Sequence, residues 1–270
     1  MIKANKIRQD VIVGVHAAKS GHPGGSLSAA DALAVLYFDE MNIDEANPNW
    51  SGRDRFVLSK GHAAPALYGA LAERGFFPVS DMEKLRHIGS HLQGHPSMET
   101  PGIDTSSGSL GQGISIACGM ALAQKLSSED YRVYAMLGDG EIEEGQVWEA
   151  LMFAGNQKLD NLCILIDNNG LQIDGNIADI NSPYPIQEKL ESFGLSVITL
   201  PDGNDVHAIR EAFKEAREIK GTPTAIILKT VKGKGVSFME NEVGWHGKAT
   251  NEEEFKIAMD ELEKAGEALE

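Results

Sequence analysis

Two short polar motifs, separated by the length of a helix and a strand, hold the residues best suited to chemistry. The first is Gly138-Asp139-Gly140 and the second is Asn168-Asn169-Gly170. Asp139 offers a carboxylate oxygen, Asn169 offers an amide oxygen, and the following turn can present a backbone carbonyl, which we assign to Leu171. Mg²⁺ prefers oxygen ligands of this kind and keeps further positions open for phosphate oxygens. The motifs therefore predict a site for a divalent metal and a diphosphate.

The segments around these motifs explain how they could meet. Tyr131–Leu137 and Leu162–Asp167 are apolar runs typical of buried strands, and Glu141–Gln157 between them has apolar residues at helical spacing. A right-handed crossover makes such strands parallel and puts both motifs at their carboxyl ends, where open α/β sheets bind ligands. A helix that begins near Glu141 would also point free N–H groups at an anion there, and Gly140 would let the backbone approach it. Glycine-rich turns after strands are common in other α/β proteins, but the crossover-length separation favours the site.

Five further motifs follow one another along the chain and narrow the interpretation. They are Ser20–Gly24 (SGHPG), Arg53–His62 (RDRFVLSKGH), Gly94–Pro96 (GHP), Gly108–Gly113 (GSLGQG) and Lys229–Gly235 (KTVKGKG). Together with the two polar motifs they resemble the first domain of transketolase, in the same order and over nearly the whole chain. The resemblance implies an α/β domain over residues 1–270, with a mainly parallel sheet, helices on both faces and a thiamine-diphosphate-binding fold. It implies thiamine diphosphate as the cofactor, with Mg²⁺, or Ca²⁺ or Mn²⁺ in its place.

Four of the eight histidines lie beside glycine in turns, where a side chain is well placed to meet a ligand. These are His22, His62, His95 and His246. By resemblance they are active-site histidines that hydrogen-bond sugar hydroxyls or cofactor phosphate and move protons. A neutral imidazole can donate at one nitrogen and accept at the other, which suits such substrates. For His16, His87 and His207, which fall in helical patterns, we expect surface or internally satisfied positions, and His91 stays undecided.

The resemblance also assigns a loop and a glutamate. The residues that it predicts to contact the cofactor are His62, Gly108, Ser109, Leu110, Gly138, Asp139, Gly140, Glu144, Asn169 and His246. Ser109 stands where most full-length members have proline. Glu144, followed by Gly145, matches a catalytic glutamate at a dimer contact, although acidic residues are also ordinary in a first helical turn. Lys229, Lys232 and Lys234 do not form a P-loop, and they are either solvated charges or phosphate contacts.

The remaining pattern predicts further elements and long functional loops. We expect helices at Asn5–Ser20, at Ser28–Glu40 with Ser28 as its cap, and at Ala63–Arg74, Gly111–Leu126 and Asp205–Lys220. We expect strands at Arg55–Ser59, Ser196–Leu200 and Thr224–Val231, and loops at Ile88–Leu110 and Lys232–Lys248. Residues 251–270 hold eight acidic side chains and predict an amphipathic helix with an acidic face.

Composition limits the partners. The 270-residue chain has 24 basic and 40 acidic residues and a net charge of −16, which argues against nucleic acid or an anionic membrane. No apolar run reaches membrane-spanning length and no signal peptide precedes the first motif, so we expect a cytoplasmic protein. Cys118 and Cys163 lie in apolar segments and should be buried, reduced thiols.

The interpretation that unites these features is the N-terminal subunit of a split transketolase. By resemblance, the complete enzyme transfers a two-carbon ketol unit from a ketose phosphate to an aldose phosphate. It requires a C-terminal partner subunit, and a two-plus-two assembly follows because the family's sites lie at dimer contacts. One alternative is a subunit of a 1-deoxyxylulose 5-phosphate synthase-like or 2-oxo acid dehydrogenase-like enzyme, which the four histidines disfavour. A non-catalytic cofactor-binding subunit is the other alternative.

Overall fold

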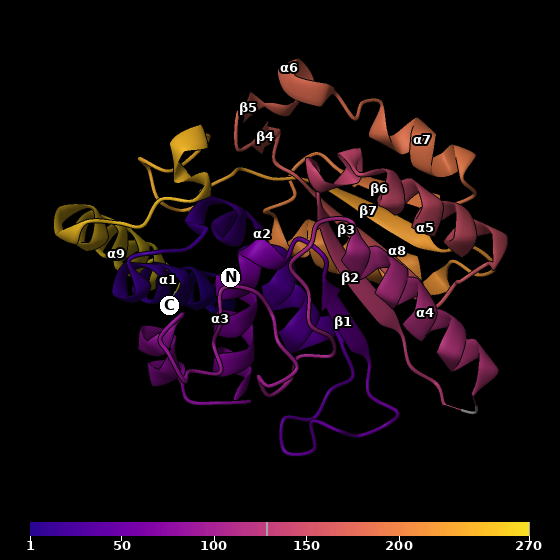
Figure 1. The fold of residues 1–270 in the computed structure, drawn as a ribbon, viewed down its shortest axis with the longest axis horizontal. Helices are drawn as coiled ribbons and strands as arrows, with labels where there is room; N and C mark the ends of the chain where they lie inside the picture. Colours follow the sequence, from indigo (N-terminus) through magenta and orange to yellow (C-terminus); the bar gives the residue numbers. More distant parts are fainter. Residues whose placement is uncertain (128, 270) are drawn as a thin grey trace.

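The fold is built on one parallel sheet. A computed structural model describes residues 1–127 and 129–269 (Figure 1). Among these residues, five strands pair in parallel in the order β1-β2-β3-β7-β6. Their bounds are β1 Arg55–Leu58, β2 Val133–Gly138, β3 Leu162–Asn168, β6 Ser196–Leu200 and β7 Thr224–Lys229. A short antiparallel pair, β4 Leu171–Gln172 and β5 Gly175–Asn176, follows the second polar motif.

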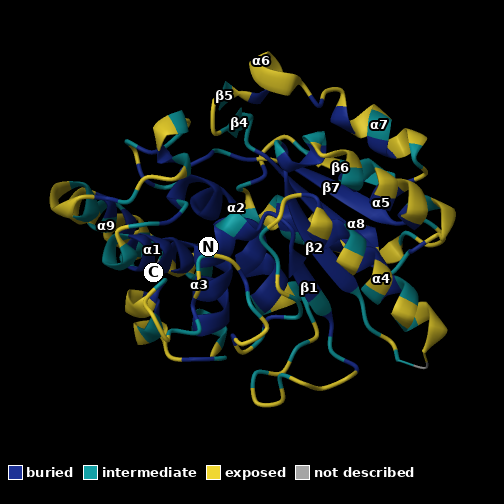
Figure 2. Ribbon diagram, in the orientation of Figure 1, coloured by how far each residue is buried: buried dark blue, intermediate teal, exposed yellow. Residues whose placement is uncertain are grey.

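Helices cover both faces of this sheet, because successive side chains of a strand point to opposite faces. Val133, Ala135 and Leu137 of β2 belong to one buried cluster, whereas Tyr134 and Met136 belong to the other. The cluster that contains Tyr134 is completed by α1 Ile2–Ala18, α2 Pro23–Val35, α3 Ala64–Arg74 and α8 Val206–Glu218. The opposite cluster is completed by α4 Gln112–Leu126, α5 Gly145–Asn156 and α7 Ile186–Ser192. Figure 2 shows the central strands of the sheet buried and the outer helix faces exposed. The predicted fold class is confirmed.

The smaller elements lie at the edges of this core. α6 spans Ile177–Asn181, and the short irregular helices are η1 Leu36–Glu40, η2 Gly61–Ala63, η3 Val79–Lys84, η4 Glu141–Glu143 and η5 Val243–His246. The acidic helix is α9 Glu252–Glu267, which packs on α1 and begins with a capping box formed by Asn251 and Glu254. His16 of α1 stacks on Phe255 of α9 with ring centroids 4.2 Å apart. A solvated acidic face therefore coexists with an apolar face that docks on the domain.

Two local predictions were wrong. The second helix begins at Pro23, so Ser28 is an interior residue and not a cap. Its hydroxyl donates instead to the Asp167 carboxylate, at 2.7 Å, and also lies 3.2 Å from the Gly25 carbonyl oxygen. His87 lies in irregular backbone rather than in a helix, because η3 ends at Lys84, but its side chain is exposed, as expected. Tertiary contacts with distant residues override the local capping preference in the first case.

Other expectations hold for the described part of the chain. Residues 88–110 contain neither helix nor strand, as predicted for a long functional loop. Cys118 and Cys163 are buried free thiols, and burial raises the pKa of each to about 12. Within residues 1–127 and 129–269, no helix combines the length and the apolar character needed to cross a membrane.

Candidate active site

A cavity of about 250 Å³ lies where β1, β2 and β3 end. It collects most of the predicted site residues from segments that are far apart in sequence. Those that line it are His22, His62, His95, His246, Gly108, Leu110, Gly138, Asp139, Gly140, Asn169 and Leu171. The other lining residues include Gly25, Lys60, Glu141, Gln172, Ile173 and Lys232. The parallel register brings these turns together, because the strands carry them to the same edge of the sheet.

Asp139 is a buried carboxylate held by its neighbours. Its Oδ2 accepts from the backbone N–H of Gly170, at 2.6 Å, and from the Asn168 amide, at 3.0 Å. Its Oδ1 accepts from the backbone N–H of Gly140, at 2.9 Å. Burial, with a contribution from the charge of Asp167, raises the pKa of Asp139 to about 6. A cation would relieve both effects, because it would compensate the charge that burial penalises.

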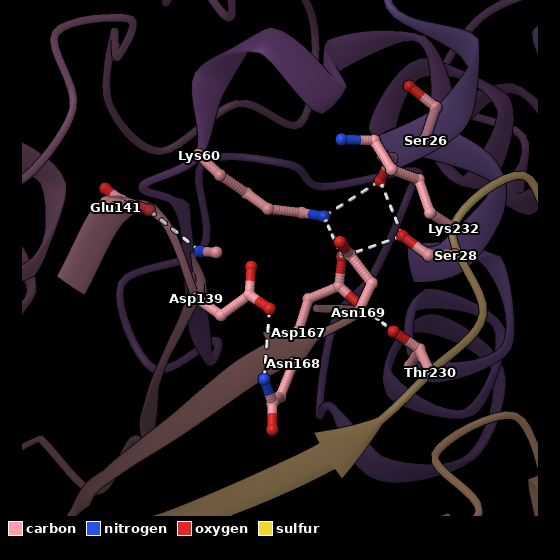
Figure 3. A network of polar contacts seen from close by, with 12 residues as sticks. Ser26, Ser28, Lys60, Asp139, Glu141, Asp167, Asn168, Asn169, Thr230 and Lys232 are labelled. Carbon is pink, nitrogen blue, oxygen red and sulfur yellow. Dashed lines mark hydrogen bonds and ion pairs between the residues drawn. The ribbon is translucent and has the colours of Figure 1, made fainter. Parts of the chain in front are cut away.

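Asn169 is oriented by a second buried carboxylate, as Figure 3 shows. Its amide N–H₂ donates to Asp167 Oδ2 at 3.0 Å, and its Oδ1 accepts from the backbone N–H of Leu171 at 3.1 Å. Asp167 also accepts from Lys60, Thr230 and Ser28. Burial alone would raise the pKa of Asp167, but the Lys60 charge and these hydrogen bonds hold it below its usual value. The amide oxygen and nitrogen of Asn169 are thus distinguished by their partners.

Two lysines supply positive charge inside the cavity. Lys60 and Lys232 are each only 1% exposed, and both line the cavity. Lys60 donates to Asp167 and to the carbonyl oxygen of Gly25, whereas Lys232 lies 3.0 Å from the carbonyl oxygen of Leu171 and 2.9 Å from His246 Nδ1. Burial and the charge of Lys60 lower the pKa of Lys232 to about 8. Buried ammonium groups beside a carboxylate and an amide oxygen fit a metal-bound diphosphate.

The four predicted histidines form one group around the cavity. Ring centroids lie 5.2 Å apart for His62 and His246, 5.4 Å for His22 and His62, and 5.6 Å for His22 and His246. His95 stands at the rim, 6.5 Å from His22. The structure thus brings together the whole glycine-flanked set and leaves His207 on the surface of α8 and His16 against Phe255.

Burial keeps these imidazoles neutral. It lowers the pKa of His22 to about 4 and of His246 to about 3, with further lowering by Arg86 at His22 and by Lys232 at His246. Burial is also the main cause that lowers the pKa values of His62 and His95. His22 Nδ1 is buried and has no hydrogen-bond partner in the described ranges. Neutral rings can both donate and accept, which suits contact with hydroxyl and carbonyl groups.

The helix predicted to begin near Glu141 does not supply the anion site. Residues 141–143 form the short helix η4, and α5 begins at Gly145 because Glu144 adopts an extended backbone with φ −68° and ψ 128°. The N-terminus that borders the cavity is that of α2, since Gly25 in its first turn lines the wall. The positive potential therefore comes from α2 and the two lysines.

Two predicted site residues lie outside the cavity lining. Ser109 and Glu144 are both exposed. Glu144 precedes α5 on the molecular surface, which is compatible with the predicted dimer contact but does not test it. Lys229 is exposed and Lys234 pairs with Glu240 at 3.3 Å, so Lys232 alone of the three lysines faces the cavity.

Sequence reasoning missed Lys60, Asp167, Glu141 and the burial of Lys232. Two of them carried a usable signal. Lys60 directly follows an apolar strand and Asp167 ends another, LCILID, and a charged residue buried at such a position needs a partner of opposite charge. In the described part of the chain no three His, Cys, Asp or Glu side chains are arranged to hold a metal ion. The predicted metal set contains only one such side chain, with an amide and a carbonyl beside it.

Comparison with known proteins assigns the family. Residues 2–265 match the family described as "Transketolase, thiamine diphosphate binding domain". The chain therefore belongs to this thiamine-diphosphate-binding family of transketolases. Among solved structures, a transketolase variant from Pichia stipitis matches with a TM-score of 0.92 and 33% identity. That match covers 97% of this chain and 41% of the other.

Two curated relatives match over almost their entire length. The chain is 46% identical to the 6-deoxy-6-sulfo-D-fructose transketolase subunit of Clostridium sp. (strain MSTE9), covering 98% of this chain and 96% of the relative. It is 40% identical to a subunit of the apulose-4-phosphate transketolase of Phocaeicola vulgatus, covering 100% of this chain and 95% of the relative. Mouse transketolase is 47% identical over 253 residues, but the match covers only 39% of it. The chain thus matches the two subunit-type relatives over nearly their whole length, unlike mouse transketolase.

Proposed function

We propose that this chain is the diphosphate-binding subunit of a transketolase that transfers a two-carbon ketol unit. The observation that carries the proposal is the cavity that is lined by Asp139, Asn169 and the buried lysines Lys60 and Lys232. A carboxylate and an amide oxygen suit a divalent cation, and two cations suit a diphosphate.

In this proposal the chain's own groups bind and orient thiamine diphosphate. Asp139, Asn169 and the Leu171 carbonyl would hold Mg²⁺, or Ca²⁺ or Mn²⁺, and the two lysines would face the phosphate oxygens. The backbone of Gly138 and Gly140 and the Gly108–Leu110 loop would lie along the cofactor. When bound, the cofactor supplies a thiazolium carbon able to carry the ketol unit, while the protein provides position and proton transfer.

The histidines would act on the substrate. His22 and His95 would hydrogen-bond sugar hydroxyls. His246, 2.9 Å from Lys232, and its neighbour His62 would contact the cofactor and move protons. Their lowered pKa values keep the rings neutral, so each ring can donate a hydrogen bond at one nitrogen and accept one at the other.

We further propose that activity requires a partner chain. The match to 39% of mouse transketolase leaves most of that enzyme unmatched, whereas the subunit-type relatives match almost in full. A C-terminal subunit would supply the rest of the site, in a two-plus-two assembly with self-association near Glu144, in the cytoplasm. A partner less acidic than this −16 chain would provide the positive potential that anionic sugars need.

The first candidate substrates are a ketose phosphate donor and an aldose phosphate acceptor. A sulfonated ketose is the second candidate donor, since the relative at 46% identity is named for 6-deoxy-6-sulfo-D-fructose. Both carry a terminal anion at the end away from the reacting carbons.

The experiment compares this chain alone with this chain and the polypeptide that co-purifies with it. Each receives Mg²⁺, thiamine diphosphate and an aldose phosphate acceptor, with either a ketose phosphate or 6-deoxy-6-sulfo-D-fructose as donor. We expect ketol transfer only from the pair. Robust turnover by the isolated chain would refute the partner requirement, and absence of cofactor binding by the pair would refute the proposed function.

A further inference from the structure

We propose that Glu141 is a positioning residue that fixes the loop Gly108–Gly111 relative to the turn Gly138–Gly140. The proposal rests on the proposed function, because it concerns how the cofactor cavity keeps its shape. Glu141 is 2% exposed, lines the cavity and lies near Asp139 and Lys60 (Figure 3). A carboxylate is almost never buried so fully unless its oxygens are satisfied by donors.

The two oxygens of Glu141 accept from three separate segments. Oε1 accepts from the Ser59 hydroxyl at 2.5 Å and from the backbone N–H of Gly111 at 2.9 Å. Oε2 accepts from the backbone N–H of Gly138 at 3.0 Å. Ser59 follows β1, Gly138 ends β2, and Gly111 closes the loop before α4. One side chain therefore joins two strand ends to the loop.

The loop needs such an attachment at its second end. At its first end, the Ser107 hydroxyl donates to the carbonyl oxygen of Leu58 at 2.7 Å. Gly108 and Leu110, which line the cavity, lie between this bond and the bond from Gly111 to Glu141. Gly111 has φ +80°, a conformation that favours glycine, so the chain turns sharply where Glu141 holds it. The two bonds together set the distance from the loop to the strand ends.

The distance between the loop and the strand ends can change very little without steric conflict. A Cβ atom on Gly61 would lie 2.8 Å from the backbone nitrogen of Gly108, and one on Gly108 would lie 3.2 Å from Cγ of His95. A shift of the loop would therefore disturb the wall of the cavity and the ring of His95 at once. Because precise placement of binding groups depends on the residues that support them, release of the loop should weaken cofactor binding.

A carboxylate can satisfy all three donors. Its oxygens are both acceptors, whereas the amide of glutamine has one acceptor and one donor. In Glu141→Gln, an N–H₂ group would face either the N–H of Gly138 or the N–H of Gly111 together with Ser59. The substitution keeps size and shape but makes one of these bonds repulsive, so it isolates the hydrogen-bonding role from packing.

Two measurements on Glu141→Gln test the proposal. Hydrogen exchange by mass spectrometry, on the chain without cofactor, should show faster exchange confined to residues 107–112 and to the end of β2. Calorimetry on the chain with its co-purifying partner should show thiamine diphosphate and Mg²⁺ binding about 10–100-fold more weakly, the loss expected for one charged hydrogen bond. Turnover at saturating cofactor should fall as well, because the released loop packs against the ring of His95.

Glu149→Gln is the matched control, since Glu149 is exposed on α5 and the change removes the same charge. It should alter neither measurement. If Glu141→Gln does not fold, Ser59→Ala removes one donor and leaves the carboxylate and both backbone bonds, and a smaller loss of affinity is expected. Wild-type exchange and affinity in Glu141→Gln would overturn the proposal, as would weaker affinity without faster exchange at residues 107–112. Because exchange is measured without cofactor, a failure of the proposed function leaves this test intact.

Discussion

Removing the charge of Asp167 should lower the free energy of unfolding, because the buried ammonium group of Lys60 would lose its counter-charge. Asp167 is fully buried and accepts from Lys60, Thr230, Ser28 and Asn169. In Asp167→Asn the ammonium group of Lys60, 1% exposed, would keep the Gly25 carbonyl at 2.8 Å but lose its counter-charge. Breaking a buried ion pair by removing one partner costs about 3–5 kcal/mol of unfolding free energy, because the other charge stays desolvated.

A double-mutant cycle measures this magnitude. Lys60→Met should be destabilising for the complementary reason, and the double variant, with both charges removed, should lose less than the sum of the single losses. We expect a coupling energy of about 2–3 kcal/mol from urea unfolding followed by circular dichroism. The exposed pair Lys264 and Asp260, 2.7 Å apart on α9, is the control and should show no measurable coupling.

The coupling energy between Lys60 and Asp167 should also have a defined pH dependence. The folded-state pKa of Asp167 is lowered, so its stabilisation is present above the unfolded value of 3.8 and is lost only as the pH falls through the folded value. The coupling should therefore be the same between about pH 6 and 8. Additive losses in the single variants, or a coupling that disappears across that range, would refute the reasoning.

Three further outcomes follow from the site and the core. Asp139→Ala should abolish Mg²⁺-dependent binding of thiamine diphosphate, measured by calorimetry on the assembled enzyme, and unchanged affinity would contradict the metal assignment. His22→Ala and His95→Ala should leave cofactor affinity nearly intact and lower turnover by about 10²–10⁴-fold, so wild-type rates in both would exclude the proton-transfer and substrate roles. Asp10→Asn should stabilise the protein increasingly as pH rises, because burial and then Glu73 raise the folded pKa of Asp10 from 3.8 to about 7. The wild type therefore loses stability between those values, and the gain in urea unfolding should reach about 4 kcal/mol above pH 7, whereas a pH-independent gain would contradict the burial of that charge.

The local pattern was sufficient for most of the architecture. Apolar runs such as Leu162–Asp167 predicted buried parallel strands, and the observed strand β3 spans Leu162–Asn168. The glycine-flanked histidines predicted a shared site, and the four rings surround one cavity. The strand prediction succeeded because strand burial depends on residues that are adjacent in sequence, whereas the meeting of the four histidines was implied by the family resemblance.

The helix start near the first polar motif shows where local reasoning failed. Acidic residues at Glu141, Glu143 and Glu144 look alike in sequence, and all three suit a first helical turn. In the fold, Glu141 turns inward to donors from Ser59 and Gly111, Glu143 accepts from Asn181 at 3.2 Å, and Glu144 is exposed. Their different roles depend on which distant groups each one reaches.

The sequence by itself indicated which segments form strands and helices and offered oxygen ligands that suit a metal-bound diphosphate, and the family resemblance implied the cluster of glycine-flanked histidines. Only the tertiary structure decided that Lys60 pairs with Asp167, that Lys232 is buried and that Glu141 holds the cavity wall. The reason is physical: a charged side chain can be buried only where partners compensate its lost hydration. For Lys60 and Asp167 those partners lie 107 residues apart, a separation that no local pattern records.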